Sequence, residues 1–591
     1  MNAVIFVNKI IIQWFRKIPH KHRVLILALL VGLFSGWAAV IIKNSVHFTK
    51  ELLTWSFVKE YENYLYFLYP FIGLYLTSLF VKYVVKKPMG HGIPNVLFAI
   101  SKNKSFIKAQ NMFASIVASS LTVGFGGSVG LEGPTVSTTS AIGSNIGRFF
   151  KQNYKTTTLL LGCGAAGAMS GIFNAPIAAL VFVLEVFMFD LTLTSMVPFL
   201  MASVAAALSS RMMLGNNVLF DIKIHDIFTI YDVPFFVLLG IFTGLISAYF
   251  NKVFIIVEEF FEKLRNKRAK LVVGGVSLGI LIFFVPPLYG EGFETIIALL
   301  NNRTDEVFFN SMFYNQRENI LLVIALLFGV VFLKVIASGI TFGAGGVGGV
   351  FAPSLFMGAT SGFVFSKSIN HFGDFSLSTT NFTLVGMAGL IAGVLHAPLT
   401  ALFLIAEITK GYELIIPLMI TSAISYLISK YFVEHSVYNV QLAKKGDLIT
   451  RHKDRAVLTM MNLEDEIEND FIKVLPEQTL GDLVQAVSKS SRNLFPVVDK
   501  KGVLQGVVTL DDIREIMFNP ELYQSVTIES IMTLAPDYVY LTDNMDIVME
   551  KFAQTNAWNL PVIYHDKYVG FVSKSKLFNA YRKQLLHFSE E

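Results

Sequence analysis

One stretch of apolar sequence occurs twice in this chain of 591 residues. The segment GAAGAMSGIFNAPIAALVFVLE, which ends at Glu185, aligns without gaps with GMAGLIAGVLHAPLTALFLIAE, which ends at Glu407, at an offset of 222 residues. A second pair, GFGGSVGLEGP (124–134) and GAGGVGGVFAP (343–353), aligns at an offset of 219 residues and matches four glycines and a proline. Two matched pairs at nearly one spacing predict two structurally related halves.

Both copies of the repeat are apolar enough to lie inside a membrane. Hydrophobic residues make up 53% of the chain and charged residues 15%, and the mean hydropathy is +0.57, which is typical of polytopic membrane proteins. A helix needs about 20 apolar residues to cross a bilayer, and such runs lie near 24–43, 63–85, 157–184, 193–210, 233–250, 270–287, 320–339 and 382–406. We therefore expect an all-α polytopic membrane domain with broken helices and two inverted-topology repeats.

The composition also sets the limits of this domain. We expect an amphipathic N-terminal helix at 1–22, because an apolar opening is followed by a basic border without a cleavage signature. The membrane domain then covers 23–438, with halves of roughly 23–215 and 230–438, and a linker of soluble character follows at 439–466.

The tail after the linker contains a shorter repeat of its own. The sequence NLFPVVDKKGVLQGVVTLDDIREIM (493–517) is echoed by NLPVIYHDKYVGFVSKSKLFNAY (559–581), and each copy predicts a β-hairpin followed by a helix. We therefore expect two α/β repeats in the tail, at 467–520 and 526–585.

Charge indicates orientation and excludes some classes of partner. Arg16, Lys17, Lys21 and Arg23 favour a cytoplasmic N-terminus, and we expect an integral protein of the plasma membrane with its tail in the cytoplasm. The formal net charge of +5 comes without a dense basic run, so nucleic acid is not an expected partner. No Ser/His/Asp set, Cys/His metal spacing or phosphate-binding loop occurs, so an enzyme is not expected either.

The paired Gly/Pro-rich segments are typical of broken helices in transporters built from repeats. The N-terminus of each half-helix presents unpaired N–H groups and a positive dipole end, so converging N-termini can bind an anion without Lys or Arg. Glycine allows the backbone to approach the ion closely. The alternative is that these glycines only permit close helix packing.

Glu132 is the single ionised side chain between Lys108 and Arg148. An acid inside a membrane helix is costly and is a functional hypothesis by default. At an N-terminus suited to anions, its carboxylate can occupy the anion site when charged and leave it when protonated. Glu132 would then be both a gate and a proton acceptor. The alternative is a buried carboxylate that caps a neighbouring helix.

Four segments match a known family in order. GHGIP (90–94), GLEGP (130–134), GGVFAP (348–353) and SVYNVQLAKKG (436–446) resemble the signature segments of the CLC chloride channels and proton-coupled chloride transporters. The tail resembles a pair of cystathionine-β-synthase (CBS) domains. The resemblance covers about residues 20–446 in the membrane part and, with the tail, nearly the whole chain.

The resemblance implies specific roles for several residues. The backbone amides of Val350 and Phe351, with the hydroxyl of Tyr438, would bind a central chloride, and Glu132 would be the external gating glutamate and proton acceptor. The amides around Gly130, Leu131, Glu132 and Gly133 would form an outer site. Tyr438 otherwise reads as an interfacial aromatic anchor. A homodimer with one pore per subunit is also implied, with no required cofactor.

Three departures from the family pattern bear on the mode of transport. His91 stands where the family often has Ser; its imidazole can donate to an anion, or it can turn aside and leave binding to the backbone. Val186 replaces a second acid on the intracellular proton route of many exchangers, which weakens strict coupling. Leu131 replaces a basic residue, which removes positive charge from the outer vestibule.

Chloride/proton antiport gated by Glu132 is the expected function, and a passive voltage- or pH-gated chloride channel is the alternative. Fluoride export is a weaker alternative, because Pro134 and Tyr438 keep the chloride-type pattern. A CBS-based sensor with a membrane anchor would not need the two matched Gly/Pro-rich breaks or an acid at the membrane midplane. A cation transporter would need several acids that face the interior of the membrane domain. In the tail, Thr509 and Asp512 fit an adenine-nucleotide site, while Lys576 occupies the matching place in the second copy, and a nucleotide-free pair remains the alternative.

Overall fold

The computed structural model describes residues 15, 17–53, 62–86, 89, 92–103, 105–189, 191–215, 228–308, 319–373, 375–440 and 461–590. Most of the predicted N-terminal amphipathic helix (1–22) and of the predicted linker (439–466) lies outside these residues, and so does His91. The chain forms two compact units, Met1–Leu448 and Ile449–Glu591.

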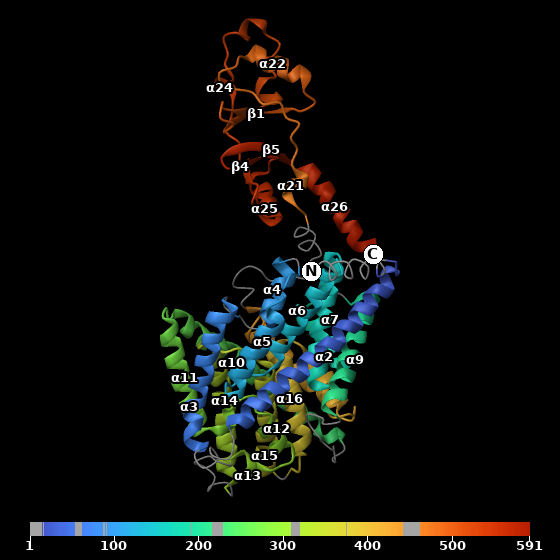
Figure 1. The fold of residues 1–591 in the computed structure, drawn as a ribbon, viewed down its shortest axis with the longest axis vertical. Coiled ribbons are helices and arrows are strands. Elements are labelled where there is room, and N and C mark those ends of the chain that lie inside the picture. Colours follow the sequence, from blue (N-terminus) through green and yellow to red (C-terminus); the bar gives the residue numbers. More distant parts are fainter. Residues whose placement is uncertain are drawn as a thin grey trace, which may run out of the picture. The chain divides into compact units, whose positions relative to one another are not determined.

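The first unit is built from helices (Figure 1). Its first part contains α2 (His20–Leu53), α3 (Glu62–Phe80) with a π-helical turn at Val81–Val85, α4 (Gly92–Lys102), α5 (Asn111–Gly124), α6 (Glu132–Phe149), α7 (Tyr154–Phe173), α8 (Pro176–Val186) and α9 (Leu193–Leu214). Its second part contains α10 (Val233–Lys263), α11 (Lys267–Phe284), α12 (Phe293–Leu300), α13 (Thr304–Val307), α14 (Ile320–Gly343), α15 (Phe351–Phe372), α16 (Thr379–Leu395), α17 (Pro398–Ile408) and α18 (Ile415–Phe432), with 3₁₀ turns at Ile230–Asp232 and Pro286–Leu288.

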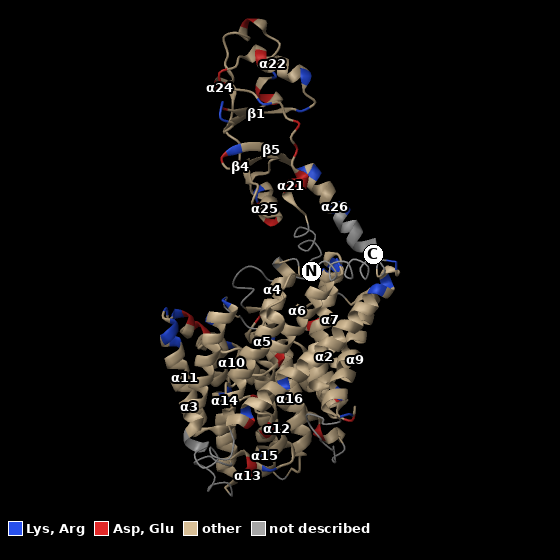
Figure 2. Ribbon diagram, viewed as in Figure 1, with Lys and Arg blue, Asp and Glu red and all other residues tan. Residues whose placement is uncertain are grey.

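The helices of this unit are suited to a membrane. Seven helices of the described ranges are long and apolar enough to cross a bilayer, at His20–Leu53, Leu65–Val85, Tyr154–Phe173, Leu193–Leu214, Ile230–Lys263, Ile320–Gly343 and Ile415–Phe432. Few Lys, Arg, Asp or Glu residues interrupt them (Figure 2). The fold is therefore the expected all-α polytopic membrane domain.

The most deeply buried helices of the unit are α15 and α16 of the second half, which pack against each other, and α6 and α7 of the first half, which also pack against each other. Every residue of α16 from Asn381 to Leu395 is buried, and so is every residue of α15 from Phe351 to Val364. Their counterparts in the first half, α7 and α6, are buried over most of their length. Buried polar side chains also occur in these helices, and several bond to the backbone of the preceding turn: the Thr135 hydroxyl donates to the carbonyl of Leu131 at 2.8 Å, and the Thr139 hydroxyl donates to that of Thr135 at 2.9 Å.

Two of the predicted apolar runs are broken, as expected of a domain with broken helices. The runs 157–184 and 382–406 each form two helices, because Asn174 and His396 adopt left-handed conformations with φ of 54° and 57°. Each is followed by an Ala-Pro pair, and the proline opens the next helix. Proline has no N–H and restricts the residue before it, so it starts a helix and cannot continue one.

The two short helices that follow these breaks cap each other reciprocally. The carboxylate of Glu407, near the end of α17, accepts hydrogen bonds from the N–H groups of Ile177 and Ala178 at 3.0 and 2.8 Å. The carboxylate of Glu185 accepts from Leu399 and Thr400 at 3.0 and 2.7 Å.

These bonds satisfy N–H groups that a helix start leaves unpaired. The two repeat-paired acids thus have structural roles.

The second unit contains two α/β repeats. In the first, α22 (Leu480–Lys489) precedes an antiparallel hairpin of β1 (Leu494–Val498) and β2 (Leu504–Thr509), which is followed by α23 (Leu510–Ile513). In the second, β3 (Val539–Tyr540) pairs in parallel with β4 (Asn559–Tyr564), which pairs antiparallel with β5 (Lys567–Ser573). The remaining helices are α21 (Leu463–Glu466), α24 (Ile528–Ile531), α25 (Met545–Thr555) and α26 (Lys574–Glu590), with a 3₁₀ turn at Pro520–Leu522.

Both hairpins lead into helices, as the repeated pattern predicts. Each repeat has its own apolar core, with Phe495 and Val508 fully buried in one and Leu560 and Val572 fully buried in the other.

Candidate anion-binding site

The loops before α6 and α15 pair with each other. The N–H of Gly130 donates to the carbonyl of Gly349 at 2.8 Å, and the N–H of Gly349 donates to the carbonyl of Gly130 at 2.7 Å. Both loops begin with a left-handed glycine, Gly126 with φ of 95° and Gly345 with φ of 96°, a conformation that favours glycine. The pairing brings the N-termini of α6 and α15, one from each half, to the same place.

Side chains reinforce this crossing symmetrically. The N–H of Val347 donates to the Thr122 hydroxyl at 3.1 Å, and the N–H of Ser128 donates to the Thr341 hydroxyl at 3.2 Å. Each threonine belongs to the opposite half from its donor. These bonds join the two loops and satisfy part of their irregular backbone, as a membrane interior requires.

A third helix begins against this crossing. Gly92 opens α4, and a Cβ atom on it would overlap the carbonyl of Gly133 in the first turn of α6. Glycine is required here because the two backbones touch. The N-termini of α4, α6 and α15 thus converge, and each contributes N–H groups without an intrahelical partner.

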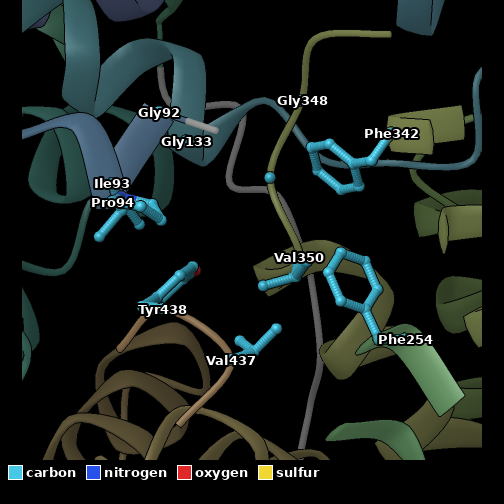
Figure 3. Close-up of a pocket in the computed structure, with 11 residues that line it drawn as sticks. Gly92, Ile93, Pro94, Gly133, Phe254, Phe342, Gly348, Val350, Val437 and Tyr438 are labelled. Atoms are coloured by element: carbon cyan, nitrogen blue, oxygen red, sulfur yellow. The ribbon is translucent and has the colours of Figure 1, made fainter. Parts of the chain in front are cut away.

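A small cavity lies between these three N-termini (Figure 3). Its volume of about 20 Å³ is enough for one guest of roughly the size of a water molecule. Most of its wall is backbone or apolar, and no charged side chain lines it among the described residues. The lining residues are Gly92, Ile93, Pro94, Gly133, Phe254, Phe342, Gly348, Gly349, Val350, Val437 and Tyr438.

Tyr438 supplies the one side-chain hydroxyl of this wall among the described residues. Its side chain is 5% exposed, and its oxygen has no hydrogen-bond partner in the described part of the chain. The hydroxyl end of the ring faces the open space in Figure 3. A buried hydroxyl without a partner is costly, and a bound ion that accepts its proton removes that cost.

Glu132 begins α6 next to the cavity and is fully buried. Neither carboxylate oxygen has a hydrogen-bond partner within the described ranges. One of them, Oε2, lies beside Gly130 and Gly349, and the carboxylate faces the backbone N–H of Ala352 in the first turn of α15. The acid thus lies among helix N-termini without completing a cap, unlike Glu185 and Glu407.

The other predicted residues differ in how they meet the cavity. Gly133 and Val350 line it directly, while Gly130 and Leu131 lie in the buried turn that leads into α6. The ring of Phe351 packs against Phe173, with centroids 5.3 Å apart, and faces away from the cavity wall. Phe351 is not among the described residues that line the cavity.

One acid near this site was missed in the sequence. Glu291 lies between the 3₁₀ turn at Pro286–Leu288 and α12, and its carboxylate is within Coulombic range of Glu132. Lys43, Lys50 and Lys334 surround it. The one sign of this acid in the sequence was its place between two glycines, shortly after the apolar run 270–287.

In the tail, Thr509 and Asp512 close the start of α23. The Asp512 oxygen Oδ2 accepts from the N–H and the hydroxyl of Thr509, both at 2.7 Å, and the carboxylate is exposed. Within the described residues Oδ1 has no such bond, so it suits a ribose hydroxyl. In the second repeat, Lys576 stands at the position that matches Asp512, so this position has no carboxylate to accept a ribose hydroxyl. The Lys576 ammonium donates to the carbonyls of Asp465 and Ile467 at 3.3 and 3.4 Å.

Known proteins were compared with this chain. A family model described as "Voltage gated chloride channel" matches residues 72–430, and the CBS domain model matches 464–519 and 528–583. The H(+)/Cl(-) exchange transporter ClcA of Vibrio cholerae is 28% identical over 447 residues, covering 73% of this chain and 91% of the relative.

Solved structures share the fold. A slow cyanobacterial Cl-/H+ antiporter aligns with a TM-score of 0.63 at 23% identity, covering 72% of this chain and 98% of that one. A eukaryotic CLC transporter aligns with a TM-score of 0.59 at 18% identity, covering 94% of this chain and 97% of that one. The family model spans more than half of the chain, and the chain belongs to the voltage-gated chloride channel (CLC) family, with a CBS domain pair at its C-terminal end.

Proposed function

We propose that this protein exchanges chloride for protons across a membrane, with Glu132 as the gate. The observation that carries this proposal is a buried, uncapped carboxylate beside a cavity at three helix N-termini. Such N-termini attract anions, and a buried acid that competes for the same N–H groups links anion occupancy to protonation. The curated relative from Vibrio cholerae is named as an exchanger of the same two ions.

The central anion site is proposed to lie in the cavity. The amides of Val350 and Phe351 at the start of α15 would donate to chloride from one side, and the Tyr438 hydroxyl would donate from the other. The anion would then satisfy a hydroxyl that otherwise lacks a partner. No cofactor takes part in this step.

The outer anion site is proposed at the start of α6. The amides around Gly130, Leu131, Glu132 and Gly133 would bind chloride whenever the Glu132 carboxyl moves away. A charged carboxylate and chloride repel each other and need the same donors, so only one of them occupies the site. Protonation neutralises the acid and lets chloride pass, and Glu132 releases this proton when its charged carboxylate returns to the site.

The exchange mode has a direct test in proteoliposomes that contain the wild-type protein. A chloride gradient should drive protons against their own concentration gradient, because Glu132 carries a proton each time it leaves the anion site. A pH electrode in a weakly buffered medium measures the proton movement, and a chloride electrode measures the anion. Chloride flux without proton movement would contradict exchange and establish a passive channel, and Val186, which weakens strict coupling, does not decide between the two modes.

Replacement of Tyr438 tests the central site. Tyr438→Phe removes only the hydroxyl, and Tyr438→Ala also removes the ring that walls the cavity. We expect the number of protons moved per chloride to fall in both variants, and further in Tyr438→Ala. The reason is that chloride can leave a weaker anion site before Glu132 has taken up a proton. Tyr431→Phe is the matched control, since that ring is 85% exposed. An unchanged ratio in Tyr438→Ala would contradict the assignment.

The assembly and the tail complete the proposal. We also propose a homodimer in the plasma membrane with one anion path per subunit and with the N-terminus and CBS pair in the cytoplasm, an orientation that the basic N-terminal border supports. The first CBS repeat is proposed to bind an adenine nucleotide through Thr509 and Asp512. The second is proposed to bind none, because Lys576 is bonded to backbone carbonyls.

A further inference from the structure

The segment that carries Glu291 is fixed against the gate region by several bonds. The ammonium of Lys334, on α14, is fully buried and donates to the carbonyls of Leu288 and Gly290 at 3.3 and 2.9 Å. The hydroxyl of Tyr289 donates to the carbonyl of Gly124, at the end of α5, at 2.8 Å. The loop before α12 is thereby held beside the loop that leads into Glu132.

This attachment places the Glu291 carboxylate at the back of the gate. It lies close to the backbone N–H of Leu131, the residue directly before Glu132, and within Coulombic range of Glu132 itself. The two acids come from different halves of the chain and from different elements. Their proximity is therefore a property of the fold that neither local sequence reveals.

The charged surroundings of Glu291 are mixed. Lys43 and Lys50 face it from α2 and Lys334 faces it from α14, while Glu132 faces it from α6. Tyr289 and Glu294 are on its own segment, Tyr66 and Tyr69 lie near Tyr289, and Tyr438 also faces Glu132.

The lysines that face Glu291 also contact other groups, so Glu291 is not one half of a simple ion pair. Lys334 directs its ammonium at two carbonyls and lies 4.8 Å from the centre of the Phe356 ring. Lys50 pairs with Glu294 at 3.0 Å and lies over the Tyr289 ring. The lysines thus surround Glu291 and stabilise its charge near Glu132.

We propose that Glu291 is a positioning residue of the gate, whose negative charge sets the pH at which Glu132 accepts its proton and leaves the anion site. Two nearby carboxylates resist being ionised together, so the charge of one favours a proton on the other. The inference rests on the proposed role of Glu132 as the gate. It adds that gating depends on a pair of acids and on the segment that holds the second one.

The test measures chloride flux through proteoliposomes as a function of pH. Glu291→Gln removes the neighbouring charge, so Glu132 should need a more acidic medium to accept its proton. We expect the pH of half-maximal flux to move to lower pH by about one unit. Glu294→Gln is the matched control, because that side chain is on the same segment but 88% exposed, and it should leave the profile in place.

Further variants separate a charge effect from a structural one. Glu291→Asp keeps the charge and should restore most of the wild-type profile, and Glu291→Ser is a second neutral variant if Glu291→Gln does not fold. In a Glu132→Gln background, Glu291→Gln should cause no further shift, because its target is gone. An unshifted profile in the neutral variants, or an equal shift in both backgrounds, would overturn the proposal.

Failure of the proposed role of Glu291 is distinguishable from failure of the proposed exchange function. If the wild-type protein conducts chloride without moving protons, exchange fails, but the pH profile of chloride flux still reports on Glu132 and Glu291. If exchange holds and the profiles of Glu291→Gln and wild type coincide, only the role of Glu291 fails.

Discussion

Glu132→Gln should reduce chloride-driven proton movement to the level of protein-free liposomes, while chloride flux stays the same or rises. Glutamine is nearly isosteric with glutamic acid and cannot accept the transported proton, so it imitates the protonated gate permanently. The charge that competes with chloride for the N-terminus of α6 is also removed. Parallel chloride-electrode and pH-electrode recordings on the same liposomes measure both effects.

Glu413→Gln is the matched control for this change, since Glu413 is an exposed acid that precedes α18 in the same unit. It should leave both fluxes unchanged. Proton movement that persists in Glu132→Gln would contradict the gate assignment and would indicate that another group carries the proton. Loss of both fluxes would indicate that the carboxylate is needed to build the site, as a capping residue would be.

The contrast between Glu132 and the two capping acids shows what could be predicted from the sequence alone. All three are buried or half-buried acids near helix starts in one membrane domain. Glu185 and Glu407 are paired by the repeat, and the structure gives each two backbone donors from the other half. Glu132 has no acidic partner at the matching position, where Phe351 stands. The broken symmetry of the repeat therefore distinguishes the proposed gate from the two capping acids.

The Gly/Pro pattern predicted the breaks, but it could not predict their pairing. The hydrogen bonds of Val347 to Thr122 and of Ser128 to Thr341 join residues more than 200 positions apart. Periodicity reports only which side of a local element is buried, so contacts of this kind leave no signal in one sequence. The same holds for Glu291, whose distance from Glu132 depends on how Lys334 and Tyr289 anchor its loop.

Gly133→Ala should nearly abolish transport, because it places a methyl group where the two halves touch. A Cβ atom at position 133 would lie 2.7 Å from the carbonyl oxygen of Gly348 and 3.1 Å from the Cα atom of Gly349. Both are backbone atoms of the paired crossing, so neither can move without disturbing the Gly130–Gly349 bonds. Overpacking of this kind costs about 1–3 kcal/mol, and we expect chloride flux to fall by the corresponding factor of roughly 5 to 150.

Gly329→Ala is the matched control for this effect. Gly329 lies inside α14, and a Cβ atom built there has no neighbour within 4 Å among the described residues. Alanine also favours helix more than glycine does, so that variant should transport and resist heat at least as well as the wild type. Thermal unfolding in detergent, recorded with the flux assay, separates a blocked path from a protein that no longer folds. Full transport by a folded Gly133→Ala variant would mean that the anion does not pass the crossing of the two halves, because a path lined by these backbones has no room for the added carbon.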